Sequence, residues 1–416
     1  MKKLVLTLVA LLVGGAVIFA QSNEAYTNQY GNLNVSTVDQ EGIVNLSNVD
    51  QTGNSNYAEV DQESDNRFYM GWWDNISDVD QEGDVNVAIV DQYGGENYSK
   101  VEQIEDPAGV NDGDADRNAA NVDQDGYSND SWLFQSGDDN WGKVKQWGMD
   151  NTSEMYQFDD ENGAEVTQFG IMNYSKVAQY DIPYGHSNGN LGNWAEVWQD
   201  GRYNWSTIDQ DGKSNYAKVT QRENLNKGDG SARFNDSDVD QIGDGNSATV
   251  WQNGDDNDSD VDQDGNLNYA YHEQGQDNND ADTDQDGNGN ASIIVQDDPF
   301  TLNIYNDAWT KQLGDRNYSY VVQIGEWNES DVYQRGNDNN ATVDQGGYLN
   351  ESDVLSWGNL NNADVDQVGV YHDSDIDQYG NGNYARHLQL GTNHWADTYQ
   401  WGNGNSSVIT QTDGAF

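Results

Sequence analysis

The chain lacks cysteine, has only three prolines and is poor in basic residues, and each scarcity excludes a class of protein. Without cysteine there is no disulfide, thiolate metal cluster or thiol nucleophile. Because 18 Lys and Arg face 73 Asp and Glu, the formal net charge is −55, which repels nucleic acid and anionic membranes and attracts cations. Hydrophobic residues make up 34% of the 416, a composition that would by itself favour disorder.

Long apolar runs are also missing, with one exception at the N-terminus. Two lysines precede an apolar run over residues 4–19, which ends at Ala20 in polar sequence. The run is short for a membrane span, so it predicts a removable signal peptide over residues 1–20. We therefore expect an exported chain without membrane insertion, with a short leader over residues 21–28.

The chain is rich in one eleven-residue pattern, Gln-x-Gly-x-x-Asn-x-(Ala/Ser)-x-Val-x. One clean copy consists of Gln51, Gly53, Asn56, Ala58 and Val60, followed by Gln62. The pattern returns about 31 times over residues 29–411, and residues 412–416 follow as a short tail. Because a short fixed period makes each unit rest on its neighbours, the chain is predicted to be a stacked array and not a globule.

Each unit is predicted to form one strand and one turn. The Asn, Ala/Ser, Val and next Gln lie two residues apart and so share one face of a β-strand, while Gln-x-Gly-x-x-Asn supplies the bend. The Ala/Ser slot alternates, as in Ser47, Ala58, Ser77 and Ala88, which implies two units per coil. We predict an all-β fold, a β-solenoid of about 15 two-strand coils with 22 residues per coil, roughly 70 Å long at ~4.8 Å per coil.

Half of the inward slots hold Asn or Gln. Stacked in register, their amides can bond from coil to coil as in amyloid ladders, whereas an unpaired buried amide costs about 1–3 kcal/mol. The structural ladder is expected to include Gln40, Asn45, Gln51, Asn56, Gln62, Gln241, Asn246, Gln252, Asn257 and Gln263.

Five units are longer than eleven residues, and the repeat resumes in frame after each. They contain all the proline and are interpreted as loops that leave the array at a turn, with a role left open. They lie between Gln62 and Gln81, Gln103 and Gln124, Gln179 and Gln199, Gln221 and Gln241, and Gln296 and Gln312.

The unit that begins at Gln51 resembles the curlin repeat of curli-type functional amyloid, Q-x-G-x-x-N-x-A-x-V-x-Q, at every specified position. The resemblance covers about residues 29–411. The chain departs from that family in its Ser-type units, in its larger number of repeats and at single slots such as Ser356, which replaces Gln.

The resemblance implies a secreted β-solenoid subunit that polymerises with itself into extracellular adhesive fibres of a biofilm matrix. It also implies export through a dedicated outer-membrane secretion channel, with a nucleator subunit as a further candidate partner. Whether this chain is a major subunit or a nucleator stays open.

The outward positions predict two unlike faces over the last eight coils. One strand series carries the acidic face, Asp236, Asp238, Asp240, Asp258, Asp260, Asp262, Asp280, Asp282 and Asp284. The opposite series is less polar and carries Thr249, Trp251, Tyr269, Tyr271, Ile293, Val295, Tyr318, Tyr320 and Val322.

Carboxylates stacked ~5 Å apart repel by roughly 0.8 kcal/mol per pair in water. One hypothesis is that the acidic face restrains premature stacking while the aromatic face makes lateral or adhesive contacts. The alternative is that the charge only keeps a β-rich chain soluble.

The segments beginning at Asp260 and Asp282 imitate calcium loops, but their twelfth positions are Tyr271 and Ile293 where an EF-hand needs Glu. No cofactor is expected, and weak Ca²⁺ capture by the acidic face is left open.

The five histidines form no catalytic set. His372 and His394 occupy Asn slots, His272 and His387 occupy Val slots, and His186 lies in an insert. We expect a non-enzymatic structural protein that assembles into curli-like fibres. The alternatives are a monomeric, cation-binding surface adhesin or coat protein and, third, a carbohydrate-binding rod that uses exposed Trp and Tyr.

Overall fold

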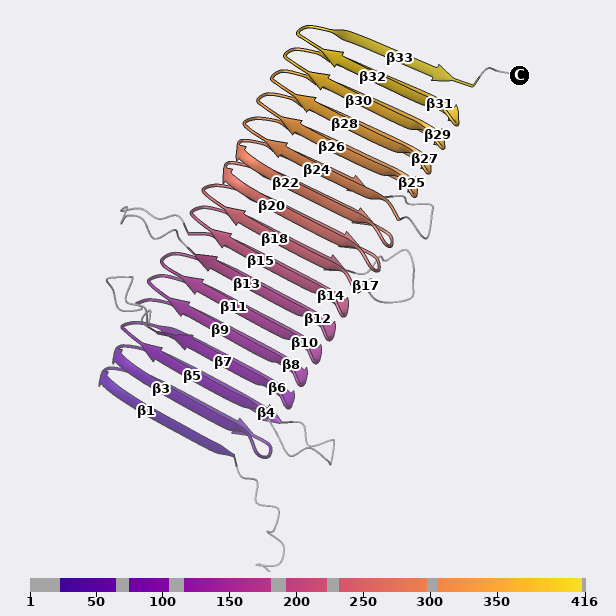
Figure 1. Cartoon of the computed structure of the whole chain (residues 1–416). Coiled ribbons are helices and arrows are strands. Elements are labelled where there is room, and N and C mark those ends of the chain that lie inside the picture. Colours follow the sequence, from indigo (N-terminus) through magenta and orange to yellow (C-terminus); the bar gives the residue numbers. More distant parts are fainter. Residues whose placement is uncertain are drawn as a thin grey trace, which may run out of the picture.

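The computed structural model describes residues 23–64, 75–104, 116–180, 192–222, 232–297 and 305–413. Over these residues the chain forms 33 strands and no helix, and the strands stack along one long axis (Figure 1). The parts of the five inserts between these ranges, His186 among them, lie outside the described residues, as do the expected signal peptide and the end of the tail.

Successive strands alternate between two parallel sheets. Sheet A has 16 strands: β1 (Glu24–Asn32), β3 (Leu46–Asn54), β5 (Ile76–Glu82), β7 (Tyr98–Gln103), β9 (Asp130–Ser136), β11 (Thr152–Phe158), β13 (Tyr174–Tyr180), β15 (Trp205–Asp211), β18 (Asp236–Ile242), β20 (Asp258–Asn266), β22 (Asp280–Asn288), β24 (Asp307–Leu313), β26 (Glu329–Arg335), β28 (Glu351–Trp357), β30 (Asp373–Tyr379) and β32 (Trp395–Trp401).

Sheet B lies opposite and contains β2 (Val35–Glu41), β4 (Tyr57–Ser64), β6 (Val87–Gly95), β8 (Ala119–Tyr127), β10 (Trp141–Met149), β12 (Gly163–Ile171), β14 (Trp194–Arg202), β16 (Tyr216–Arg222), β19 (Ser247–Asn253), β21 (Tyr269–Gly275), β23 (Ala291–Gln296), β25 (Tyr318–Glu326), β27 (Asn340–Tyr348), β29 (Asn362–Val370), β31 (Tyr384–Thr392) and β33 (Ser406–Thr412). The two-residue β17 (Ala232–Arg233) pairs with the end of β14.

The predicted all-β solenoid with two strands and 22 residues per coil is confirmed. Val239 pairs with Val261 in sheet A, and Val343 pairs with Val365 in sheet B, so equivalent slots lie side by side. The 16 strands of sheet A make sixteen coils where about 15 were expected. The first strand, β1, begins at Glu24, inside the segment expected to be a leader.

The inserts leave the coil register unchanged. Gln51 pairs with Gln81 across the first insert, and Gln285 pairs with Gln312 across the last, so identical slots meet on both sides. Strands therefore keep alternating between the two sheets after each insert. The prediction that the acidic strands share one sheet depended on this alternation.

The core is a thin double layer of small side chains. Inward Val, Ala and Ser alternate with outward polar or aromatic residues, so the strands show a period-two burial pattern such as that of β4. Val60 and Val90 are fully buried, as are Ala58 and Ala88. The apolar core is divided into two clusters, and the division falls between Ala270 and Ala281.

The turns need left-handed backbone at two positions of each unit. Gly265 has φ +124°, and a Cβ built there would lie 2.0 Å from the carbonyl oxygen of Gly287, so only glycine fits. Two residues later in the repeat, the residue before Asn is also left-handed, with φ 65° at Val85. A β-branched residue in that region is strained, which shows that stacking overrides local preference.

Candidate functional site

The glutamine slots form two hydrogen-bonded ladders along the rod. In sheet B each side-chain Nε2 donates to the Oε1 of the Gln in the next coil, without interruption from Gln40 to Gln411. The Nε2 to Oε1 distance is 2.8 Å between Gln40 and Gln62. In sheet A the ladder starts at Gln29 and has one break, at Ser356, whose hydroxyl donates to Gln378 at 3.2 Å.

The ten ladder residues named from the sequence all point inward. Gln40, in the first coil, is half-buried, and the other nine are fully or almost fully buried. Gln51 and Gln241 donate to the next coil in sheet A, and Gln62 and Gln252 do so in sheet B. These buried Gln amides avoid the cost of an unpaired polar group because their partner is another copy of the same slot.

The asparagine slots bond differently from the expected amide-to-amide stack. The Oδ1 of Asn34 accepts the backbone N–H of Asn56 at 3.0 Å, and the Nδ2 of Asn56 donates to the carbonyl of Gly83 at 2.8 Å. At the other turn the expected contact exists beside the backbone one, since the Nδ2 of Asn257 lies 3.2 Å from the Oδ1 of Asn235. The Asn side chains of the first pair thus bond backbone groups alone, whereas those of the second also bond each other. The Oδ1 of Asn45 has no hydrogen-bond partner among the described residues.

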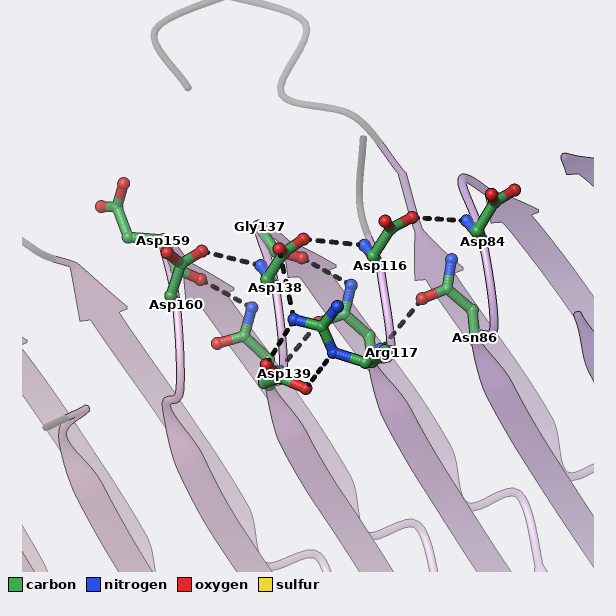
Figure 2. A network of polar contacts seen from close by, with 11 residues as sticks. Asp84, Asn86, Asp116, Arg117, Gly137, Asp138, Asp139, Asp159 and Asp160 are labelled. Atoms are coloured by element: carbon green, nitrogen blue, oxygen red, sulfur yellow. Dashed lines mark hydrogen bonds and ion pairs between the residues drawn. The ribbon is translucent and has the colours of Figure 1, made fainter. Parts of the chain in front are cut away.

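A third ladder runs outside the core, at the residue after the turn glycine (Figure 2). The backbone N–H of Asp84 donates to Oδ1 of Asp116 at 2.6 Å, and Asp116 donates likewise to Asp138 at 3.0 Å. Asp138 continues the ladder to Asp160 at 2.8 Å. This ladder was not predicted from the sequence, although the frequent Asp or Asn after the repeat's Gly was its visible signal.

Arg117 offsets part of the charge of that ladder. Its Nε and Nη2 donate to the two oxygens of Asp139 at 2.7 and 2.6 Å, and Nη2 lies 3.5 Å from Asp138 (Figure 2). The guanidinium lowers the pKa of Asp139, whereas burial raises the pKa of Asp138. The bidentate geometry stabilises the charged carboxylate at the surface.

Two buried histidines each join a chain of hydroxyls that crosses the core. Nδ1 of His272 lies 2.8 Å from the hydroxyl of Ser259, and Nε2 lies 2.7 Å from the hydroxyl of Thr283. The Thr283 hydroxyl in turn lies 2.9 Å from that of Ser292. All four side chains are fully buried, and His272 and Thr283 stand in Val slots where the apolar core divides. Burial lowers the pKa of His272 to about 3, so the ring is neutral.

The same chain recurs around His387. Nδ1 of His387 lies 2.7 Å from Ser374, Nε2 lies 2.8 Å from Thr398, and Thr398 lies 3.0 Å from Ser407. Burial lowers the pKa of His387 to about 4. Although hydroxyl and imidazole meet, both rings are fully buried, so the arrangement satisfies a polar core and offers no access to a substrate.

The acidic face lies on three neighbouring strands of sheet A, β18, β20 and β22. Its nine aspartates form three columns in register, for example Asp238 beside Asp260 beside Asp282. Partial burial and the neighbouring carboxylates raise the pKa of Asp240, Asp260 and Asp280 to about 6 and that of Asp282 to about 7. These columns are therefore electrostatically strained when ionised.

The acidic face ends at β24. There Trp309 and Lys311 take the positions of Asp282 and Asp284, and Lys311 forms an ion pair with Asp284. On the opposite strands of sheet B, Arg222 stacks over Trp251 at 4.8 Å, and Tyr271 donates to Glu273 at 2.8 Å. The run of aspartates is thus interrupted at β24, and carboxylates return on later strands of sheet A, where Asp353 pairs with Asp375 and Asp375 with Asp397.

Both end coils present uncovered strand edges within the described part of the chain. Every residue of β1 is exposed, and the inward Val38 of β2 and Ile409 of β33 are partly exposed where inner coils bury the same slot completely. Across the described residues no helix is long or apolar enough to span a bilayer. The same residues contain no cluster of three or more His, Asp or Glu side chains able to hold a metal ion.

These features define a class: a two-sheet β-solenoid held by repeated side-chain ladders. The family model of the curlin associated repeat matches the chain at residues 74–104, 192–222 and 235–265. These three segments therefore carry the curlin repeat, which belongs to a family of structural proteins. No curated protein matches the chain.

Proposed function

We propose that the chain is a secreted structural subunit that assembles end to end into curli-like extracellular fibres for adhesion and matrix formation. The single observation that carries the proposal is the pair of uncovered end coils on a rod whose coils are otherwise in register. Unpaired edges of parallel sheets are templates for another chain. The curlin repeats support the same reading.

The ladders have a direction, and this direction selects one way of joining two copies. Each Gln donates its Nε2 toward the C-terminal end and accepts at Oε1 from the N-terminal side. Among the described residues no coil precedes Gln29 or Gln40, so their Oε1 atoms receive no ladder bond. The amides of Gln400 and Gln411 have further donor capacity toward a following coil.

A head-to-tail joint would therefore extend both ladders, with Gln400 beside Gln29 and Gln411 beside Gln40 of the next copy. Strands would stay parallel, as they are inside the rod. A head-to-head joint would instead set donors against donors and antiparallel strands against each other. Parallel continuation is the joint that the hydrogen-bond pattern supports.

Cysteine cross-linking tests this joint, because the chain has no thiol of its own. In the head-to-tail register Val408 faces Thr37, one strand spacing of ~4.8 Å away, which is within disulfide reach. The variant T37C/V408C should give fibres by electron microscopy and a ladder of disulfide-linked oligomers. The matched control T37C/T412C, displaced by about 13 Å along the strand, should form fibres without that ladder.

Two results would count against the proposal. A chain that persists as a monomer would support the surface-adhesin alternative, especially if it needed Ca²⁺. Dimers formed by V408C alone would indicate that identical ends meet, which contradicts head-to-tail growth.

A further inference from the structure

The last coils of sheet A carry a column of exposed rings at one fixed slot, the residue after the core Gln or Ser356. Trp357, Tyr379 and Trp401 lie in successive coils, with ring centres 6.3 Å and 5.6 Å apart. Trp357 is 47% exposed and Trp401 is 75% exposed, so the rings cover no core. Tyr399 adds a fourth ring, 5.6 Å from Tyr379.

These rings line a shallow apolar hollow of about 400 Å³. Its other walls are Gly380 and Gly402, which have no side chains to fill it. A hollow of this size lies within the range of small-ligand sites. Because the rings repeat once per coil, the hollow runs along the rod axis and suits an extended ligand with a repeated flat face.

Carboxylates run beside the rings on the same face. Asp353, Asp375 and Asp397 form a column in register, and Asp377 lies between that column and the rings. Partial burial and the neighbouring acids raise the pKa of Asp375 to about 6, and burial together with Asp377 and Asp375 raises the pKa of Tyr379. Strands β28, β30 and β32 contain no Lys or Arg to offset this charge.

Cationic side chains stack on indole rings within the molecule itself. Arg335 occupies the same slot one coil earlier, and its guanidinium lies 4.4 Å from the centre of the Trp357 ring. Lys100 stacks in the same way on Trp132, at 4.9 Å. A cation over an indole face is attracted by the ring quadrupole, and carboxylates nearby add to the attraction.

We propose that this surface, the ring column with its parallel carboxylates, binds an extended cationic glycan, a β-linked polymer of amino sugars with free amino groups. The apolar faces of successive sugar rings lie on Trp357, Tyr379 and Trp401, and the ammonium groups face Asp375, Asp377 and Asp397. A glycan fits better than a basic peptide because the hollow is lined by rings and glycines at a regular spacing. The site does not depend on fibre assembly.

The test is calorimetric titration of the full chain, near neutral pH, with a β-1,4-linked glucosamine hexamer. The N-acetylglucosamine hexamer controls for charge, and spermine supplies charge without rings. We expect the free-amine hexamer to bind about tenfold or more tightly than either control. The variant W357A/W401A should lose about tenfold in affinity, and D375N/D377N should remove the preference for free amines.

A matched control removes two rings elsewhere. Trp141 and Trp194 stack at 5.6 Å on sheet B, so W141A/W194A should leave binding unchanged. All substituted residues point outward, and circular dichroism checks that the solenoid persists. Equal binding by W357A/W401A, or equally tight binding of spermine, would overturn the proposal. Tighter binding of oligoarginine would assign the surface to a basic peptide instead.

Discussion

Two stretches of sheet A, β9–β15 and β18–β22, share one interior and have opposite exteriors. Outside β9–β15 the rings of Trp132 and Tyr156 lie 5.3 Å apart, and those of Tyr174 and Trp205 stack at 4.0 Å. On β18, β20 and β22 all nine outward-facing positions before the core Gln are aspartates. In both stretches the three inward positions of each strand hold, in order, Ser or Ala, then an apolar residue or Thr, and then Gln.

The interior and exterior of this rod are therefore set independently. Inward slots must match the coil before and the coil after, so their identity is repeated. Outward positions need only tolerate a neighbour ~5 Å away, so rings stack in one stretch and carboxylates strain the other. Stability is therefore expected to come from the shared ladder, and pH response from the acidic stretch.

The largest effect is expected from breaking the ladder once in each stretch. Gln157 and Gln263 each accept from the preceding Gln at 2.8 Å and donate to the next, so Q157A and Q263A remove equivalent bonds. Each should cost about 2–4 kcal/mol through unpaired amides and a cavity. Denaturation by urea, with hydrogen exchange to locate the loss, measures both.

Similar losses are expected in the two stretches despite their unlike surfaces. A loss confined to one of them would contradict a shared interior.

The reverse change is S356Q, which places Gln in the single gap of the sheet A ladder. It should raise the unfolding temperature by adding the missing bond from Gln334, about 1 kcal/mol, while its amide replaces the bond that Ser356 already donates to Gln378.

The second effect concerns pH and is expected to be largest in the acidic stretch, where four of the nine aspartates have a pKa raised to about 6 or 7. The folded-state pKa of Asp260, about 6, and that of Asp282, about 7, lie above the ordinary value of 3.8. The folded chain thus binds more protons than the unfolded one between these values, so stability is full below about pH 4 and falls as pH rises through 6 to 7. D260N/D282N should be more stable than the parent at pH 8, on the order of 1 kcal/mol after discounting for solvent screening.

The control for this pH effect has the opposite sign. Arg117 lowers the pKa of Asp139, so that carboxylate stabilises the fold above its ordinary pKa and stops doing so in acid. D139N should therefore weaken the fold at pH 8 and leave it unchanged at low pH. His272 and His387, with lowered pKa values, oppose the aspartates below pH 6.5. Equal fibre growth rates at pH 5 and 8 would contradict any role of the acidic face in assembly.

The smallest effect compares two serines in the same slot of sheet A. Ser153, in the aromatic stretch, has a buried hydroxyl without a hydrogen-bond partner among the described residues. Ser259, in the acidic stretch, bonds to His272 at 2.8 Å. S153A should be neutral or slightly stabilising, whereas S259A should cost about 1 kcal/mol. Thermal unfolding of the two variants decides, and equal losses would contradict the assigned role of the histidine chain.

Much of the fold could be predicted because the repeat is strict. Spacing of two within a unit puts Asn56, Ala58, Val60 and Gln62 on one face, and alternation of Ser and Ala sets the coil at two units. The positions of the acidic columns followed from counting along that period. The histidine chains could not be predicted from the repeat, since their partners are residues of other strands, and the role of His272 depends on the direction of its ring nitrogens.

The repeat alone specifies the coil, its period, the inward slots and which residues lie on each face of a strand, because an eleven-residue repeat leaves one register in which like residues stack. Which atoms bond depends on the folded structure: Gln amides run in one direction, Asn oxygens accept backbone N–H groups, and Asp84, Asp116 and Asp138 form a ladder outside the core. Periodicity specifies which residues are neighbours, whereas hydrogen bonds also require distance and angle, which exist only once the coils are stacked.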